Sequence, residues 1–335
     1  MKHRRVVIEG KEGMEIPFAK YQAVGNDFIV IDLLAAVKDA ISKRPDPHGN
    51  AIGVDPLPLA RSICDRHTGV GADGLLAMSP PKDQKHDARM RVFNADGSTA
   101  EMSGNGVRCA AAYLLESGRE AKPGRSAKAA KRPASGRTLR IETGAGVKSL
   151  RVVEAQETRW VFQVGMGKPI LAPGKIPFNG ADAGPVVGFP LPTRGGTVEA
   201  TVTSMGNPHC SVFVEDFDAV DWPEIGRAIE GYEIFPNRTN VEFIRVLSRN
   251  EIEVRFWERG VGKTQSSGTG SCAAVVASIL NRRTARKVRV RTLAGTLDVA
   301  WPEKGEVSLT GPVELVARGT YYLALPAGVL KADSR

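Results

Sequence analysis

The feature that most constrains the fold is an internal repeat. The segment RVFNADGSTAEMSGNG (Arg91–Gly106) lines up with RFWERGVGKTQSSGTG (Arg255–Gly270) at a constant offset of 164 residues. This offset places Ser103 on Ser267. Each segment starts with strand-like alternation, passes through a Gly-rich turn and leads into a run of small apolar residues, which is typical of a buried helix.

The helical runs that follow the two turns are Val107–Leu115 and Ser271–Leu280. Glycine is rare in helix interiors and common at helix starts, so SGNG and SGTG are expected at helix N-termini. A second match lies in the same order: AVGNDFIVID (Ala23–Asp32) is similar to SMGNPHCSVFVED (Ser204–Asp216), with a Gly-Asn pair leading into a strand. Two ordered matches predict a duplicated domain.

Short segments bounded by turn residues predict further strands, and these strands outnumber the helices without a regular β–α–β alternation. We therefore predict an α+β fold of two pseudo-symmetric domains, each a mainly antiparallel sheet around one central helix. In KVRVR (Lys287–Arg291) apolar and basic residues alternate, so one face is expected to be solvated. The other predicted strands are Gly74–Met78, Ala88–Asn94, Leu139–Glu142, Arg159–Val164, Thr197–Met205, Val241–Leu247, Glu251–Trp257, Thr296–Trp301, Val307–Thr310 and Tyr321–Leu325.

The repeat also suggests domain boundaries. We predict an N-terminal domain from residues 14–150 plus about 313–330, and a C-terminal domain from residues 151–312. Residues 1–13 are predicted to be a basic leader, and residues 118–138 a flexible basic insert.

The formal net charge of +9 is concentrated in these two segments. Between Arg119 and Arg140 there are eight basic residues against Glu120 alone, in a background rich in Pro, Gly, Ala and Ser. Such composition favours a solvated loop. A patch that binds nucleic acid or a membrane surface is the alternative, but aromatic residues for stacking on bases are missing from the insert. The rest of the chain is nearly neutral, so nucleic acid is not expected as the main partner.

The chain shows neither an apolar secretory signal nor a run approaching the roughly 18 apolar residues of a membrane span. Its four cysteines are not arranged in CxxC pairs. We interpret them as reduced thiols of a cytoplasmic protein without a membrane partner. They are Cys64, Cys109, Cys210 and Cys272.

The paired turns suggest proton-transfer chemistry. The first N–H groups of a helix lack partners within the helix, and the helix dipole there favours negative charge. A substrate carboxylate would suit such a site. Ser103 and Ser267 are placed symmetrically, as a two-base proton transfer at one carbon would require. The alternative is that both serines are simple N-caps.

Other motifs point to weaker possibilities. GVGADG (Gly69–Gly74) matches GxGxxG literally, but it neither follows an apolar strand nor opens an apolar helix, which argues against a dinucleotide fold. Asp65, His67, His209 and Cys210 lack a metal-binding spacing, so we predict no metal. A GxSxG elbow is absent from the sequence, which argues against a serine hydrolase.

Two further residues have open interpretations. Arg259 could present its guanidinium fork to a carboxylate, or form a surface ion pair. His209 lies beside Asn207 in sequence and is either part of a site or structural, whereas His67 is interpreted as a structural hydrogen-bonding residue.

Six motifs occur in order between about Phe18 and Ala274: VGNDFIVID, DRHTGVGADGLL, FNADGSTAEMSGNGVRCAA, MGNPH, NRTNVEF and WERGVGKTQSSGTGSCAA. Together they resemble the diaminopimelate epimerase family. The resemblance implies two pseudo-symmetric domains with the active site in the cleft between them. It implies cofactor-independent inversion of LL-diaminopimelate to the meso form, in lysine and peptidoglycan precursor biosynthesis, by an isomerase that is a homodimer.

The resemblance also implies which residues form the site. Ser103 and Ser267 take the catalytic positions. His209 and Gly74 are possible supporting residues. The implied substrate-binding residues are Asn26, Asn94, Gly104, Asn105, Asn207, Asn240, Glu258, Arg259, Gly268 and Thr269.

The chain departs from the family at the catalytic positions. The family places a cysteine immediately before GNG and before GTG, where this chain has Ser103 and Ser267. A serine hydroxyl is a far weaker acid than a thiol and needs an adjacent base. Cys109 and Cys272 lie more than a helical turn further on, so they are not expected to replace the missing thiols. Gly74 stands where the family commonly has a Gln that reaches the substrate.

Three explanations of the double serine stay open. The chain is a natural divergent member with weak or no activity, a superfamily enzyme with different chemistry such as isomerisation or one-sided elimination, or a protein with both cysteines deliberately replaced. The first is favoured, because an engineer would have left Gly74 unchanged. A divergent or inactive member would bind, or isomerise, another amino acid or small carboxylate.

Overall fold

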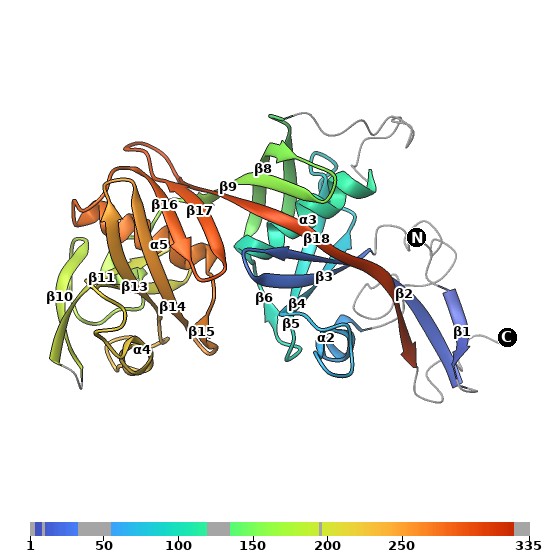
Figure 1. The fold of residues 1–335 in the computed structure, drawn as a ribbon, viewed down its shortest axis with the longest axis horizontal. Helices are drawn as coiled ribbons and strands as arrows, with labels where there is room; N and C mark the ends of the chain where they lie inside the picture. The colour runs from blue at the N-terminus through green and yellow to red at the C-terminus, as the bar shows by residue number, and fades with distance from the viewer. Residues whose placement is uncertain (1–3, 9–10, 33–54, 119–134, 194–195, 325–335) are drawn as a thin grey trace. The chain divides into compact units, whose positions relative to one another are not determined.

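The structure is a computed structural model that describes residues 4–8, 11–32, 55–118, 135–193 and 196–324 (Figure 1). Most of the predicted basic insert, 118–138, lies outside the described residues. The chain divides into two compact units. Unit 1 comprises Met1–Ala23, Asp27–Trp160 and Val313–Arg335, and unit 2 comprises Val24–Asn26 and Val161–Pro312.

The described part of unit 1 is built mainly of strands, with one long and one short helix. Its elements are β1 (Arg4–Ile8), β2 (Lys11–Ala23), β3 (Asn26–Asp32), α2 (Pro56–Cys64), β4 (Gly74–Ser79), β5 (Ala88–Asn94), β6 (Thr99–Ala100), α3 (Gly104–Ser117), β7 (Thr138–Thr143) and β8 (Gly146–Ala155). The strand β9 (Arg159–Gly167) continues from this unit into unit 2.

The described part of unit 2 is also built mainly of strands. Its elements are the short helix η2 (Pro173–Lys175), β10 (Val186–Thr193), β11 (Gly196–Ser204), β12 (Pro208–Phe213), α4 (Trp222–Glu230), β13 (Asn240–Ser248), β14 (Glu251–Glu258), β15 (Gly262–Thr264), α5 (Gly268–Leu280), β16 (Lys287–Thr292) and β17 (Gly295–Ala300). The last strand, β18 (Val307–Ala324), returns the chain to unit 1.

The two units repeat one pattern of strand pairing, which confirms the duplicated α+β fold. In unit 1, β3 pairs in parallel with β4, β4 antiparallel with β5, β5 in parallel with β7, and β7 antiparallel with β8. In unit 2, β12, β13, β14, β16 and β17 follow the same order. Two parallel strands need a long crossover connection between them. Helix α3 lies in the connection between β5 and β7, and α5 lies in the connection between β14 and β16.

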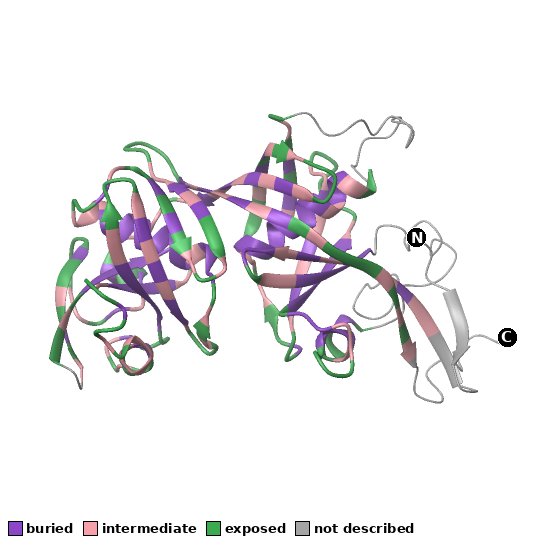
Figure 2. Ribbon diagram, viewed as in Figure 1, coloured by how far each residue is buried: buried purple, intermediate pink, exposed green. Residues whose placement is uncertain are grey.

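The central helices α3 and α5 form the cores of the two units. Nearly every residue of each helix is buried (Figure 2). α3 packs against β2, β4, β5, β7 and β8, and α5 against β11, β12, β13, β14, β16 and β17. Their small side chains let strands approach on several sides, which fixes the position of each helix start.

Each unit has a second helix that the sequence patterns did not predict. α2 begins after Asp55, whose side chain accepts a hydrogen bond from the backbone of Leu57, and α4 begins after Asp221, which caps Glu224. Both helices carry proline in the first turn, where the absent N–H costs nothing. The expectation of one central helix per domain therefore covers only part of the helices described.

Two strand predictions also differ from the structure. Val307–Thr310 and Tyr321–Leu325 were expected as separate strands, but β18 runs continuously through Gly311, Pro312 and Gly319. In the predicted leader, β1 pairs antiparallel with β2. Among the described helices, none has the length and apolar character needed to cross a membrane.

Candidate active site

Ser103 and Ser267 occupy matched positions at the starts of α3 and α5. Both residues have extended backbone, with φ −129° and ψ 125° at Ser103 and φ −137° and ψ 129° at Ser267. The Ser103 Oγ accepts a hydrogen bond from the Gly106 N–H at 3.0 Å, and the Ser267 Oγ accepts one from the Gly270 N–H at 3.2 Å. The predicted helix starts are confirmed, and both serines are N-caps. A role in proton transfer stays a prediction.

The helix starts are suited to an anion. The dipoles of α3 and α5 add up to a partial positive charge at these ends. As acceptors in the caps, the two hydroxyl oxygens leave their own protons available for donation. Gly104 and Gly268 open the helices and are buried, as Ser267 is. A carboxylate would therefore find backbone N–H groups at either helix start.

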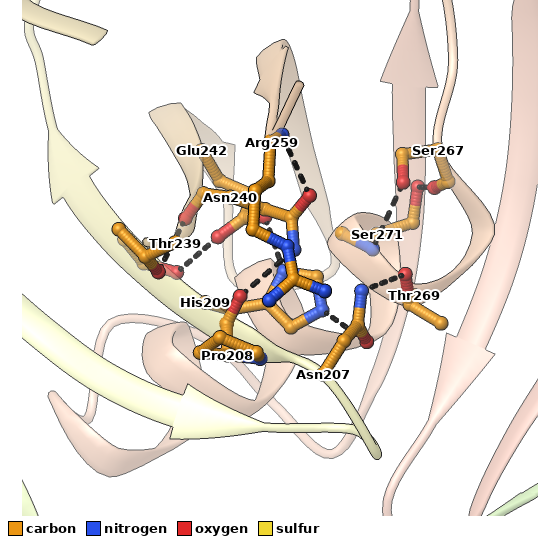
Figure 3. Close-up of polar contacts among 12 residues, drawn as sticks. Asn207, Pro208, His209, Thr239, Asn240, Glu242, Arg259, Ser267, Thr269 and Ser271 are labelled. Atoms are coloured by element: carbon orange, nitrogen blue, oxygen red, sulfur yellow. Dashed lines mark hydrogen bonds and ion pairs between the residues drawn. The ribbon is translucent and has the colours of Figure 1, made fainter. Parts of the chain in front are cut away.

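A buried network links β12 and β13 to the start of α5 (Figure 3). The Nδ1 atom of His209 lies 2.6 Å from Glu242 Oε1, and its Nε2 atom lies 3.0 Å from Asn207 Oδ1. The Ser211 hydroxyl donates to Glu242 Oε2 at 3.1 Å. The Asn207 Nδ2 donates to Thr269 Oγ1 at 3.5 Å. The structure thus brings Asn207, His209 and Thr269 together, as predicted for a site, and adds Glu242.

Asn240 and Arg259 form a second group beside this network (Figure 3). The Asn240 Nδ2 donates to the Pro208 carbonyl at 2.8 Å, and its Oδ1 accepts from the Arg259 backbone N–H at 3.0 Å. The Arg259 Nη1 donates to the Asn237 carbonyl at 2.9 Å. Within the described part of the chain, Arg259 forms no ion pair, which goes against the surface ion-pair interpretation. A guanidinium group has further donors that can bind a carboxylate.

Gly270 is required for the close approach of α5 to the network. A Cβ atom at this position would lie 2.9 Å from the Phe256 ring and 3.1 Å from Glu242 Oε1. We predict that Gly270→Ala lowers the free energy of unfolding by about 1–3 kcal/mol through overpacking. The measurement is urea denaturation of both proteins. Gly174→Ala is the control, since its Cβ would meet nothing within 4 Å; equal losses in the two variants would contradict the packing argument.

Glu258, at the end of β14, lies near Ser267. Burial raises the pKa of Glu258, and the side-chain hydrogen bond with Ser267 and the charge of His209 oppose that shift. The Ser267 hydroxyl therefore has the neighbouring carboxyl group that the sequence alone did not place beside it.

The raised pKa of Glu258 predicts a pH dependence of stability. A raised pKa means that the folded state binds the proton more tightly, so stability falls as the pH rises from 4.5, the ordinary value, through the folded value. We expect the free energy of unfolding of Glu258→Gln to fall less between pH 4.5 and 7 than that of the wild-type protein. Urea denaturation at both pH values measures this difference.

Glu253→Gln provides a control of opposite sign. Burial acts to raise the pKa of Glu253, but hydrogen bonds from Arg255 and Arg245 outweigh it and lower this pKa. Its contribution to stability is therefore present above the ordinary value and lost as the pH falls. Identical pH profiles for the two variants would show that burial of Glu258 does not control its protonation.

Unit 1 has different residues at the corresponding positions. Gly74 pairs with Phe28 in β3, as Asn240 pairs with His209 in β12. A Cβ at Gly74 would lie 2.9 Å from the Phe93 carbonyl, so the backbone leaves little room there for a side chain. At this pair of positions unit 1 is therefore less polar than unit 2.

The predicted asparagines of unit 1 have polar partners within it. The Asn94 Nδ2 donates to Ser98 Oγ at 2.8 Å. The Asn105 Oδ1 accepts from Arg108 Nη2 at 2.8 Å, and both of these residues are buried. Arg108 was not predicted as a site residue; the available signal was a lone arginine within the apolar run of α3.

An ion-pair cluster holds the segment next to Asn26. The Asp27 carboxylate lies 2.9 Å from Lys20 Nζ and 2.8 Å from Arg66 Nη2, and Arg66 also reaches Asp73 at 2.8 Å. The motifs VGNDF and DRHTGVGADG are thus joined through their charged residues. This cluster supports the start of β3, which Asn26 opens.

The remaining candidates have structural explanations. Asp65 Oδ1 accepts from the backbone N–H groups of His67 and Thr68, which accounts for DRHT as a turn. Groups of at least three side chains suited to a metal are absent from the described residues. Cys109 and Cys272 are buried, and burial raises the pKa of Cys109 to about 12. Cys109 is therefore a poor substitute for a reactive thiol.

Comparison with known proteins decides the family. The diaminopimelate epimerase family profile matches residues 18–172 and 201–316. The chain belongs to this family. It is 43% identical to a diaminopimelate epimerase from Pelotomaculum thermopropionicum, over 91% of this chain and 98% of the relative. It is 41% identical to one from Desulfitobacterium hafniense, over 91% of this chain and 97% of the relative.

Solved structures share the fold at low sequence identity. A hydroxyproline epimerase from Agrobacterium vitis matches with a TM-score of 0.62 at 14% identity, covering 94% of each chain. A methylitaconate-delta-isomerase matches with a TM-score of 0.58 at 13% identity, covering 94% of this chain and 98% of the other. Family membership places the chain in the isomerase class, among epimerase-like enzymes.

Proposed function

We propose that the protein is a cofactor-independent epimerase that converts LL-diaminopimelate to the meso form at a low rate. Two-base inversion needs one proton-transfer group on each side of the Cα atom. Ser103 and Ser267 are those groups in the proposal. The observation that carries it is the matched geometry of the two serine-capped helix starts, within a family of diaminopimelate epimerases.

Substrate binding is assigned to the polar groups around the helix starts. In unit 2, Arg259 and the N-terminus of α5 supply donors for a carboxylate, and Asn207 and Asn240 line the same region. In unit 1, Asn94, Asn105 and Gly104 are the proposed counterparts, together with Asn26, which belongs to unit 2 and opens β3. With Gly74 in place of a longer side chain, recognition of the distal end of the substrate is expected to be weak.

The low rate follows from the chemistry of serine. A serine hydroxyl gives up its proton far less readily than a thiol, so it needs a base beside it. Ser267 has Glu258 within hydrogen-bonding reach. At the matched position of unit 1 the chain has Asn94, which is not ionisable. Proton transfer is therefore expected to be more efficient on the Ser267 side.

A second candidate is a protein that binds a diamino acid, or another small carboxylate, without turning it over. One observation favours it: both serine hydroxyl oxygens already serve as N-cap acceptors. The two candidates share the ligand site and differ only in chemistry.

Binding and inversion together separate the candidates. Calorimetry with LL- and meso-diaminopimelate measures binding, and chiral chromatography after prolonged incubation measures inversion. Binding with inversion supports the epimerase, and binding alone supports the second candidate. An absence of binding to both isomers would contradict the epimerase and would restrict the second candidate to a carboxylate other than diaminopimelate.

The family resemblance supports three further parts of the proposal. We propose a homodimer, a cytoplasmic location, and a role in lysine and peptidoglycan precursor biosynthesis. Sedimentation velocity at micromolar concentration tests the first of these, and a monomer would contradict it.

A further inference from the structure

The His209 side chain is buried and has both ring nitrogens against acceptor oxygens. Its Nδ1 lies 2.6 Å from Glu242 Oε1, and its Nε2 lies 3.0 Å from Asn207 Oδ1. A carboxylate oxygen and an amide oxygen accept hydrogen bonds and do not donate them. Each contact therefore requires a proton on the ring nitrogen, so this arrangement describes a His209 with two ring protons and a positive charge.

The surroundings of His209 include two carboxyl groups. The Glu242 carboxylate is fully buried and pairs with the ring, while its second oxygen accepts from Ser211. The Glu258 carboxyl group also interacts with His209 through charge. The positive groups nearby are the N-terminus of α5, which approaches Glu242 at Gly270, and Arg259, which lies beside the network (Figure 3). A buried carboxylate without a cationic partner would be costly, so Glu242 and a protonated His209 stabilise one another.

The protonation of His209 and the direction of the Asn207 amide are coupled. With its Oδ1 held by His209, Asn207 directs its Nδ2 toward Thr269 at the start of α5. A neutral His209 with its proton on Nδ1 would have an acceptor at Nε2. Asn207 would then turn its NH₂ group to His209 and its oxygen to Thr269. Because anions are recognised by N–H donors, the first direction suits a carboxylate at the helix start and the second repels it.

We propose that Glu242 is a positioning residue that keeps His209 doubly protonated and thereby directs the Asn207 NH₂ group toward a substrate carboxylate at the start of α5. Glu242 itself does not contact the ligand and acts through His209. The identity of the ligand rests on the proposed function, whereas the state of His209 does not.

Nitrogen NMR tests the state of His209 directly. In protein labelled with ¹⁵N-histidine, long-range ¹H–¹⁵N spectra distinguish protonated from unprotonated ring nitrogens, and the His209 signals are assigned by their loss in His209→Gln. At neutral pH we expect two protonated nitrogens in the wild-type protein and one in Glu242→Gln. An unprotonated Nε2 in the wild-type protein would overturn the proposal, whether or not any variant folds.

Ligand affinity tests the positioning role. We expect Glu242→Gln to raise the Kd for meso-diaminopimelate, measured by calorimetry, by about tenfold or more, as for loss of a hydrogen bond to a charged group. Ser211→Ala is the matched control: it removes one bond to Glu242 but keeps its charge, so we expect two ring protons and less than about a threefold change in Kd. An unchanged Kd in Glu242→Gln would overturn the positioning role.

The two measurements separate this inference from the proposed function. If the wild-type protein fails to bind meso-diaminopimelate, the proposed function is contradicted while the nitrogen spectra still decide the state of His209. If it binds and His209 is neutral, the inference fails and the proposed function stands.

Discussion

The double replacement Ser103→Cys with Ser267→Cys is expected to raise the rate of LL- to meso-diaminopimelate conversion by about 10²–10⁴-fold, the usual contribution of a well-matched acid–base group. A thiol has an unperturbed pKa of about 8.5, and a helix N-terminus lowers it. Both side chains already lie at such N-termini. Chiral chromatography of the product over time measures the rate.

Two comparisons make this result specific. Each single replacement is expected to give much less than the double variant, because inversion uses both groups. Ser271→Cys places a buried thiol one helical turn beyond Ser267 and should leave the rate unchanged. An unchanged rate in the double variant would mean that the protein no longer accepts this substrate, and Gly74 would be the first position to test.

The second large effect is expected at Arg259. Arg259→Gln removes the guanidinium that is proposed to bind the substrate carboxylate, while the backbone N–H that holds Asn240 is kept. A hydrogen bond to a charged group contributes about 1.5–3 kcal/mol. We therefore expect the Kd for meso-diaminopimelate to rise by about one to two orders of magnitude, as measured by calorimetry.

Arg289→Gln is the control for Arg259. Arg289 is an exposed arginine of the same unit, and its nearest described carboxylate is Asp298 at 3.6 Å. Its replacement removes the same charge from the same unit but should leave the Kd unchanged. Equal effects of the two replacements would mean that Arg259 contributes only to the overall field and does not contact the ligand.

The repeat allowed the parts of the fold nearest the helix starts to be predicted from sequence. The offset that aligned Ser103 with Ser267 placed α3 and α5 correctly, because small apolar runs after Gly-rich turns have few other uses. The alternation in Lys287–Arg291 was confirmed as well: its valines are buried and its basic residues exposed. In these segments the local sequence pattern was sufficient to predict the secondary structure.

Helices α2 and α4 could not be predicted as readily. In Pro56–Cys64 two prolines lie near the start of a short segment, and in Trp222–Glu230 a proline and a glycine interrupt nine residues. The capping residues Asp55 and Asp221 were the available signal, since Asp before a first-turn proline is typical of a helix start. Tertiary packing on the neighbouring strands completes these short helices.

Only part of the polar network of unit 2 could be predicted from the sequence. Asn207, His209 and Thr269 were found through their motifs, but Glu242 lies between Val241 and Phe243 in a strand, where an acidic residue usually faces solvent. Its burial depends on the parallel pairing that sets Glu242 beside Ser211 and Asn240 beside His209. A pairing between strands so distant in sequence has no local signal.

The most direct test of the account is exchange of the Cα hydrogen in heavy water. Meso-diaminopimelate is incubated with the wild-type protein and with the Ser103→Ala, Ser267→Ala double variant, and deuterium at Cα is followed by NMR. The account predicts slow incorporation with the wild-type protein and none with the variant. Incorporation at the same rate in both, or no incorporation by a wild-type protein that binds the ligand, would contradict proton transfer by the two serines.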